Sequence, residues 1–330
     1  MSTLAPLLES FFTERLSAQR QASPNTIAAY RDAWCLLLRY AQARTGKPPS
    51  RLALEDLDAP LIGDFLNHLE SERGVSVRTR NARLTGIRAL FHFAAYRHPE
   101  QAALIQRVLA IPTKRSSKAV VTYLDDNEIR ALLAAPDLTT RIGRRDHALL
   151  VIAIETGMRV SEITGLTCDA VRFGTGAHVR CHGKGRKERV TPLRRDARKI
   201  LRAWLTERNG APNDPLFPGP KGRALSRDAV RRLVERHLAT AAATCPSLQA
   251  KNVTPHTLRH SCAMNLLRHE VDPATIALVL GHEDVRTTYG VYLHADLTLK
   301  EKAIARTAPL GTHRGRYRPP DSLLAFLEDL

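Results

Sequence analysis

The 330-residue sequence has no long hydrophobic run. Its longest uninterrupted apolar segment, residues 148–154, is far shorter than the ~18 residues that a membrane-spanning helix requires. Near the N-terminus, Glu9 and Glu14 interrupt the apolar residues, which argues against a secretory signal peptide. We therefore expect no membrane association and a cytoplasmic location.

Cysteines are few and scattered, and no pair has CxxC spacing (Cys35, Cys168, Cys181, Cys245 and Cys262). This usage suits reduced thiols in a cytosol and argues against a structural zinc site. The sequence also lacks a phosphate-binding P-loop and a carboxylate cluster that would hold magnesium. No cofactor and no metal are expected.

Acidic residues are outnumbered, with 33 Asp and Glu against 50 Lys and Arg, which gives a formal net charge of +17. Arginine-rich proteomes also produce basic surfaces without a specific partner, but an excess this large favours a polyanion. Up to residue 110 there are 14 basic and 10 acidic residues, and the remainder holds 36 and 23. Both parts are positive, so both are expected to contact DNA.

The N-terminal part is predicted to be all-helical over residues 3–95. Ser23-Pro24 and Ser76 are helix-start signals, and a seam of apolar residues follows each of them at helical spacing. The helix after Ser76 is rich in arginine, which would form either a solvated face or a set of phosphate contacts that fix the register on DNA. The arginines are Arg78, Arg80, Arg83 and Arg88.

From about Arg97 to Lys118 the periodic pattern is lost, which is typical of a linker. Its end is basic and includes Lys114 and Arg115, which are further candidates for contact with the DNA backbone. The domain organisation that we predict is a helical domain over residues 1–110, a basic linker over 111–120, a second domain over 121–310 and a tail over 311–330.

The second part begins with Asp125-x-x-Glu128, a pattern typical of a helix start. The apolar run 148–154 predicts a buried helix that ends at Gly157 and presents Arg159 at a turn. We expect Ser161 to cap the next helix, and Glu162 to pair with Arg159.

Residues 177–193 have strand-like composition around Gly183-Lys184-Gly185, which predicts a hairpin with a basic tip. Such a tip is either a soluble loop or a groove-contacting element in which glycine lets the backbone approach DNA. Helices are expected over residues 196–208 and from Ser226 onward. The candidate DNA contacts of this region are Arg186 and Lys187 in the tip, and Arg231 and Arg232 in the later helix.

Thr254-Pro255 starts another helix, on which His256 and Arg259 lie three residues apart and therefore face the same way. Leu280-Gly281 is a helix C-cap signal that places His282 just beyond a helix end. Two tyrosines, Tyr289 and Tyr292, follow. These residue types form an anion-binding set together with a nucleophile.

The order of these motifs resembles the signature of the tyrosine recombinase (phage integrase) family, and the resemblance spans residues 4–309. It carries the elements Thr-Gly-x-Arg-x-Ser-Glu, a hairpin lysine, His-x-x-Arg, Leu-Gly-His and a tyrosine. The resemblance implies a mainly α fold with a small antiparallel β-sheet, arranged as a two-domain clamp on DNA. It also implies double-stranded DNA with specific recombination sites as partner, and a homo-oligomer, a tetramer, on that DNA.

The resemblance assigns the chemistry residue by residue. Two arginines, Arg159 and Arg259, would clamp the scissile phosphate, and His282 would add a hydrogen bond. Lys184 would protonate the leaving 5′-oxygen, and His256 would assist proton transfer at the nucleophile. The nucleophilic tyrosine would form a covalent 3′-phosphotyrosine, so neither ATP nor metal would be needed.

The nucleophile is predicted to be Tyr292, although its distance from His282 is one residue longer than the usual family spacing. Thr287-Thr288 and the downstream pattern Tyr292-x-His294 match the context that relatives have around the nucleophile. Tyr289 lacks that downstream histidine and would be a packing or phosphate-contact residue.

Other readings of the same residues are a type IB topoisomerase, which relaxes one strand, and a DNA-binding relative without catalysis. The tail at residues 311–330 includes a short amphipathic helix that would dock on a neighbouring subunit or on its own domain. The segment after Tyr292 resembles integrases carried by transposable elements, which favours a mobile-element role.

Overall fold

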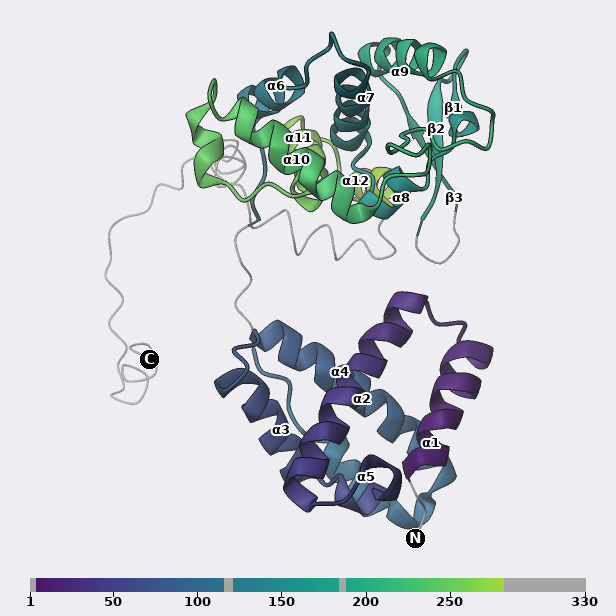
Figure 1. Cartoon of the computed structure of the whole chain (residues 1–330), viewed down its shortest axis with the longest axis vertical. Coiled ribbons are helices and arrows are strands. Elements are labelled where there is room, and N and C mark those ends of the chain that lie inside the picture. The colour runs from purple at the N-terminus through teal and green to yellow at the C-terminus, as the bar shows by residue number, and fades with distance from the viewer. Residues whose placement is uncertain (1–3, 116–120, 184–187, 282–330) are drawn as a thin grey trace, which may run out of the picture. The chain divides into compact units, whose positions relative to one another are not determined.

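The chain forms two compact units, Met1–Ala119 and Val120–Leu330. The computed structural model describes residues 4–115, 121–183 and 188–281 (Figure 1). Over those ranges no helix is both long and apolar enough to cross a membrane. The predicted C-terminal tail, residues 311–330, lies outside the described residues.

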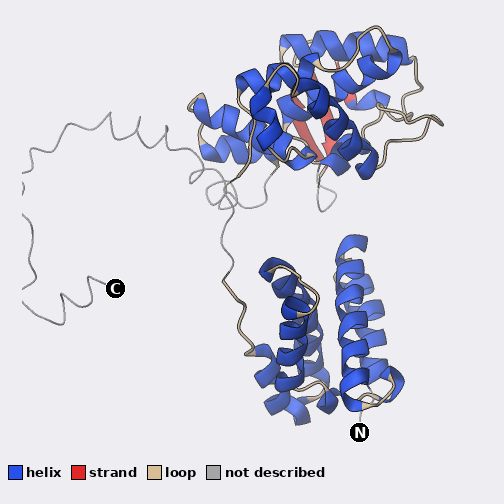
Figure 2. Ribbon diagram, turned by 60° about the vertical axis from the view of Figure 1, so that its left-hand side comes forward, coloured by secondary structure: helices blue, strands red, loops and turns tan. Residues whose placement is uncertain are grey.

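The first unit is built from helices, and Figure 2 shows no strand in its described part. The elements are α1 (Leu4–Ser10), the π-helical η1 (Phe11–Gln19), α2 (Pro24–Thr45), α3 (Ala59–Ser71), α4 (Val77–Arg97) and α5 (Ala102–Leu109), with short 3₁₀ turns η2 (Pro49–Arg51), η3 (Leu54–Asp56) and η4 (Pro99–Gln101). The predicted starts are confirmed: the side chains of Ser23 and Ser76 accept hydrogen bonds from the third residues of α2 and α4.

The core of this unit surrounds α4. The apolar seam expected from the helical spacing is fully buried and consists of Leu84, Ile87, Phe91 and Ala94. On α2, the Trp34 Nε1 donates to the Gly86 carbonyl (3.3 Å), which joins the two long helices through a buried polar contact.

The expectation of a patternless linker from about residue 97 was wrong for its first half, because α5 lies there. Ile105 and Val108 are three residues apart and bury their side chains in the core of the first unit. Two buried positions in an eight-residue helix give too little periodicity to be recognised in the sequence, and the helix depends on packing against α4.

The second unit holds the remaining elements. They are α6 (Asp126–Ala134), α7 (Arg141–Thr156), α8 (Val160–Thr164), η5 (Cys168–Ala170), β1 (Val171–Arg172), β2 (His178–His182), β3 (Glu188–Pro192), α9 (Arg195–Arg208), α10 (Arg227–Ala241), η7 (Pro246–Ala250), α11 (Pro255–Arg268) and α12 (Pro273–Leu280). The predicted helix starts at Asp125, Ser226 and Thr254 are confirmed by side-chain hydrogen bonds to the first turns.

A small antiparallel sheet has the strand order β1-β2-β3. The predicted hairpin is confirmed as β2 and β3, in which Cys181 pairs with Arg189 and Arg180 with Val190. The two-residue strand β1 was not predicted, because so short a segment shows no alternation. The fold class expected from the sequence, mainly α with a small antiparallel sheet, is confirmed.

Helix α7 forms the centre of the second core, with Ala148, Leu149, Leu150 and Ile152 fully buried. Residues 148–153 of this helix are all buried and leave no solvated face, as the unbroken apolar run predicted. This burial fixes the position of the helix end, from which the turn bearing Arg159 departs.

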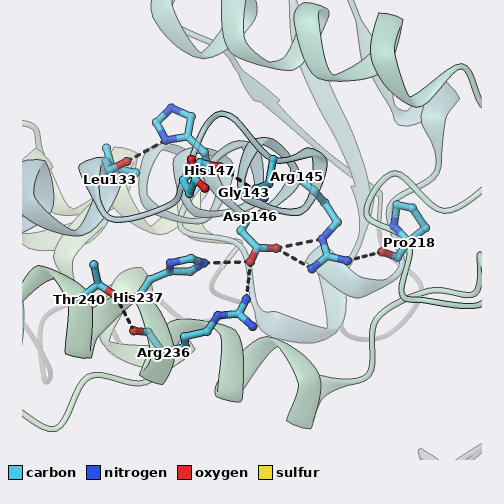
Figure 3. Close-up of polar contacts among 11 residues, drawn as sticks. Leu133, Gly143, Arg145, Asp146, His147, Pro218, Arg236, His237 and Thr240 are labelled. Carbon is cyan, nitrogen blue, oxygen red and sulfur yellow. Dashed lines mark hydrogen bonds and ion pairs between the residues drawn. The ribbon is translucent and has the colours of Figure 1, made fainter.

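A fully buried carboxylate, Asp146, ties α7 to α10 (Figure 3). Its Oδ1 accepts two hydrogen bonds from Arg145 (2.9 and 2.7 Å), and its Oδ2 lies 2.6 Å from Arg236 Nη2 and 2.9 Å from His237 Nε2. Arg145 also donates to the Pro218 carbonyl (2.7 Å). A buried charge is tolerated only when it is paired in this way, so the network fixes the relation of α7, α10 and the loop at Pro218.

Candidate active site

The turn after α7 is shaped by Gly157, which has a left-handed backbone (φ 58°) and caps the helix. The chain then extends through Arg159, which is the N-cap residue of α8. The expected cap by Ser161 was wrong, because Ser161 lies inside the first turn of α8 and is exposed. The side chain that caps the start of α8 is that of Glu162, whose Oε2 accepts a hydrogen bond from the Arg159 backbone N–H (2.9 Å).

The expected pairing of Glu162 with Arg159 is confirmed. Arg159 Nη1 donates to Glu162 Oε1 (2.8 Å), and the Glu162 side chain is only 2% exposed. Arg159 Nη2 donates to the Gly281 carbonyl at the end of α12 (3.1 Å). The guanidinium is thus held at both ends between α8 and α12.

Arg259 lies on α11 and is 3% exposed. Its Nη1 donates to the Gly157 carbonyl (2.7 Å) and its Nη2 to the Leu280 carbonyl (2.8 Å). One arginine therefore contacts both glycine-containing turns, which are far apart in the sequence. The structure brings Arg159 and Arg259 together at neighbouring carbonyls of the same helix end.

His256 is exposed near the start of α11, and its ring stacks on that of His260, with 5.8 Å between the ring centroids. Burial, the neighbouring His256 and the positive charge of Arg259 lower the pKa of His260 to about 4. His260 is therefore neutral near pH 7. The three-residue spacing predicted a shared face, but His256 is exposed whereas Arg259 is buried.

The end of α12 completes this part of the site. Asp272 accepts from the backbone N–H groups of Ala274 and Thr275, and Gly281 caps the other end with a left-handed backbone (φ 65°). The predicted Leu280-Gly281 helix end is confirmed. Lys184, His282, Tyr289 and Tyr292 lie outside the described residues.

One largely covered arginine near these groups was not among the sequence candidates. Arg189 on β3 is 10% exposed; its Nη2 donates to Glu162 Oε2 (2.7 Å) and its Nη1 to the Val279 carbonyl. Its neighbour Val190 is 55% exposed. This strand exposes its valine and covers its arginine, which reverses the usual pattern, and the covered arginine has a buried acidic partner in Glu162.

The arginines of α4 differ in exposure. Arg78 is exposed, as a DNA contact requires, but Arg80 is 5% exposed and donates to Asn81 and to the Pro112 carbonyl. Arg83 donates to the Ala29 carbonyl (3.2 Å), and Arg88 donates to the Ile111 carbonyl. The expected arginine-rich surface was therefore wrong for Arg80, whose guanidinium joins α4 to the end of the first unit.

The remaining candidate DNA contacts are exposed where the structure describes them. Lys114 pairs with Glu70, and Arg115 is exposed beside it. On α10, Arg231 and Arg232 both pair with Asp228. Arg186 and Lys187 lie outside the described residues.

Within the described ranges, no group of three or more His, Cys, Asp or Glu residues is placed to hold a metal ion.

Comparison with known proteins agrees with this architecture. Residues 122–298 match the phage integrase family, and residues 10–102 match the phage integrase N-terminal SAM-like domain. The chain is 53% identical over 329 residues to a putative integrase/recombinase, y4rC, of Sinorhizobium fredii, with 100% of this chain and 99% of that protein covered. It is 31% identical over 311 residues to tyrosine recombinase XerD of Pseudomonas putida, with 93% and 98% covered.

Solved structures give the same result. A crystal structure of the XerH site-specific recombinase bound to its palindromic difH substrate matches with a TM-score of 0.70 and 25% identity, over 87% of this chain and 81% of that one. The Tn1549 transposon integrase in complex with circular intermediate DNA shares the fold, with a TM-score of 0.69 at 16% identity, over 93% of this chain and 100% of that one. The chain thus belongs to the phage integrase family, and it is a site-specific tyrosine recombinase, an enzyme that breaks and rejoins DNA strands.

Proposed function

We propose that six side chains of this recombinase carry out strand cleavage: Arg159, Lys184, His256, Arg259, His282 and Tyr292. Arg159 and Arg259 bind the non-bridging oxygens of the scissile phosphate, because a guanidinium is permanently charged and forms two parallel hydrogen bonds. His282 adds a third donor. Tyr292 is the nucleophile, with His256 assisting its deprotonation and Lys184 protonating the leaving oxygen.

The observation that carries this proposal is the convergence of Arg159 and Arg259 on the last carbonyls of α12. One buried guanidinium (Arg259) and one half-buried guanidinium (Arg159) at the same helix end concentrate positive charge there, and Glu162 pairs with Arg159. A phosphate placed there replaces water with fixed donors, which stabilises the charge that develops on the phosphoryl oxygens.

Arg159 retains donors for this task. A guanidinium carries five N–H groups, and within the described residues its side chain uses Nη1 for Glu162 and Nη2 for Gly281. The Nε hydrogen and the second hydrogens of Nη1 and Nη2 remain for an anion. The existing contacts fix the orientation of the plane, so little side-chain entropy is lost on binding phosphate.

The reaction conserves the energy of the bond that it breaks. The Tyr292 phenolate attacks phosphorus, the bond to the 5′-oxygen breaks, and Lys184 supplies the proton to that oxygen. The product is a 3′-phosphotyrosine ester and a free 5′-hydroxyl. Attack by a 5′-hydroxyl from another strand reverses these steps and rejoins the DNA, so no energy source is consumed.

A nicked suicide duplex tests the assignment, because loss of the short 5′-fragment traps the covalent complex. Tyr292→Phe should abolish the trapped complex and leave DNA binding intact, since only one hydroxyl is removed. Tyr289→Phe is the matched control and should retain trapping. Covalent complex that persists in Tyr292→Phe and disappears in Tyr289→Phe would reassign the nucleophile.

We further propose that the recombinase acts as a homo-oligomer, a tetramer, on specific sites in double-stranded DNA, and that it works in the cytoplasm. The apolar residues Leu323, Phe326 and Leu327 of the tail are spaced for one helix face that is too short to be stable alone. Deleting residues 320–330 should leave the fold and single-site binding unchanged and weaken multi-subunit complexes in gel-shift and light-scattering measurements. Wild-type assembly by the truncated chain would contradict a role of the tail in assembly.

A further inference from the structure

Three consecutive carbonyls at the end of α12 each accept a hydrogen bond from a different arginine. Val279 accepts from Arg189, Leu280 from Arg259 and Gly281 from Arg159. The last carbonyls of a helix lack intrahelical donors and carry partial negative charge, so cations there stabilise the helix end. We call this group the arginine cluster.

Arg189 is the member of the arginine cluster that comes from the sheet. Its side-chain contacts join β3 to Glu162 on α8 and to the Val279 carbonyl of α12. Strand β3 begins at Glu188 and pairs with β2 in the hairpin. One side chain therefore connects the hairpin, the turn of Arg159 and the end of α12.

The carboxylate of Glu162 is shared between two of the arginines. Its Oε1 accepts from Arg159 and its Oε2 from Arg189 (2.8 and 2.7 Å). Because Glu162 is buried, its charge is tolerated only when both oxygens are compensated. Without Arg189, the Glu162 carboxylate would keep only one of these two ion pairs, the one with Arg159. Its position, and with it the position of the Arg159 guanidinium, would then be less restricted.

The Arg189 side chain also packs on Gly281. A Cβ added at residue 281 would lie 2.9 Å from Arg189 Cδ and 3.3 Å from Arg189 Nε. The left-handed φ of 65° already favours glycine at this position. The side chain of Arg189 thus leaves no room for a Cβ at Gly281, where α12 ends.

We infer that Arg189 is a positioning residue for the strand-cleavage reaction. It fixes Glu162, and through Glu162 the plane of the Arg159 guanidinium, and it fixes the carbonyl end of α12. This inference rests on the proposed role of Arg159 at the scissile phosphate. It implies that Arg189 acts on the rate of cleavage and has little effect on DNA affinity, since its described polar contacts are to Glu162 and to the carbonyl end of α12.

The experiment is single-turnover cleavage of a nicked duplex at saturating protein, together with the Kd for the same duplex. Arg189→Gln should lower the rate of covalent-complex formation about tenfold or more, because a small displacement of a reacting group has a large kinetic effect. The Kd should stay within about threefold. Arg189→Lys restores the charge without the fork and should recover part of the rate.

Arg145→Gln is the matched control, because Arg145 is a similarly buried arginine paired with a buried carboxylate outside the site. Compared at equal fractions of folded protein, it should cleave at the wild-type rate.

The inference would be overturned if both variants lost the same share of the cleavage rate, or if Arg189→Gln cleaved at the wild-type rate. If Arg189→Gln does not fold, wild-type cleavage by Arg189→Lys overturns it. Arg159→Ala separates the two hypotheses: normal trapping by that variant contradicts the proposed function itself.

Discussion

Leu280 packs directly on the α-carbon of Gly157: a Cβ at residue 157 would lie 2.4 Å from Leu280 Cδ2. Arg259 donates to the carbonyl oxygens of the same two residues. The turn that carries Arg159 and the end of α12 are therefore one packed unit, and neither can shift without the other. This contact explains why a residue without a side chain stands at position 157.

Replacing Gly157 should destabilise the second unit. In Gly157→Ala the left-handed backbone costs about 1 kcal/mol and the contact with Leu280 adds about 1–3 kcal/mol of overpacking. Gly222→Ala is the control, because Gly222 has φ +75° and nothing within 4 Å of its added Cβ. Urea unfolding of both variants isolates the packing contribution, and equal losses would show that Leu280 does not restrict residue 157.

The buried Asp146 network makes stability depend on pH. Burial alone would raise the pKa of Asp146, but the hydrogen bonds and positive charges of His237 and Arg145 outweigh it and hold the pKa below its ordinary value. A lowered carboxyl pKa contributes stability that is present above the unfolded pKa of about 3.9 and is lost as the pH falls through the folded pKa.

Asp146→Asn should therefore lower the free energy of unfolding at pH 7 by about 3–5 kcal/mol, because it leaves buried cations uncompensated. It should also flatten the loss of stability below pH about 4. Chemical denaturation from pH 2.5 to 7 measures both effects. Asp228→Asn removes an exposed carboxylate from α10 and should change little. If Asp146→Asn lost stability at low pH as steeply as the wild type, Asp146 would not be the source of this pH dependence.

The neutral His260 predicts a second pH effect in a different window. With a folded pKa of about 4 against an ordinary value of 6.5, the unfolded chain binds a proton that the folded chain does not bind. Stability should thus decrease as the pH falls from 6.5 to 4. His260→Gln should reduce this slope, whereas His269→Gln, at an exposed position past the end of α11, should retain it.

The contrast between two arginines of α4 tests the DNA-contact surface. Arg78→Ala should reduce the slope of log K against log salt by about 0.9, the contribution of one phosphate contact, without changing stability. Arg80→Ala should instead lower the unfolding free energy by about 1–3 kcal/mol, because it removes buried hydrogen bonds to the chain near Pro112. Duplex titrations at several salt concentrations, paired with urea unfolding, separate these effects. An unchanged slope in Arg78→Ala would remove that residue from the interface.

The sequence by itself determined the parts of the structure that depend on near neighbours. Caps such as Ser23, Thr254 and Asp272 bond to backbone groups two or three residues away, so each signal lies within a few letters of the sequence. The hairpin and the buried run of α7 were predictable for the same reason. The motif order was enough to indicate the recombinase family.

Only the tertiary structure decided which charged residues face inward. The sequence around Arg78 and Arg80 gives no sign that their exposure differs. In the fold, the chain near Pro112 returns to α4 and accepts a hydrogen bond from Arg80, which is buried. Asp146 has two partners on α10, Arg236 and His237, which are 90 and 91 residues away in the sequence. Arg189 finds Glu162 at a separation of 27 residues and Val279 at 90. Such pairings arise when packing excludes water and each buried charge requires a partner, a condition that no local pattern of residues encodes.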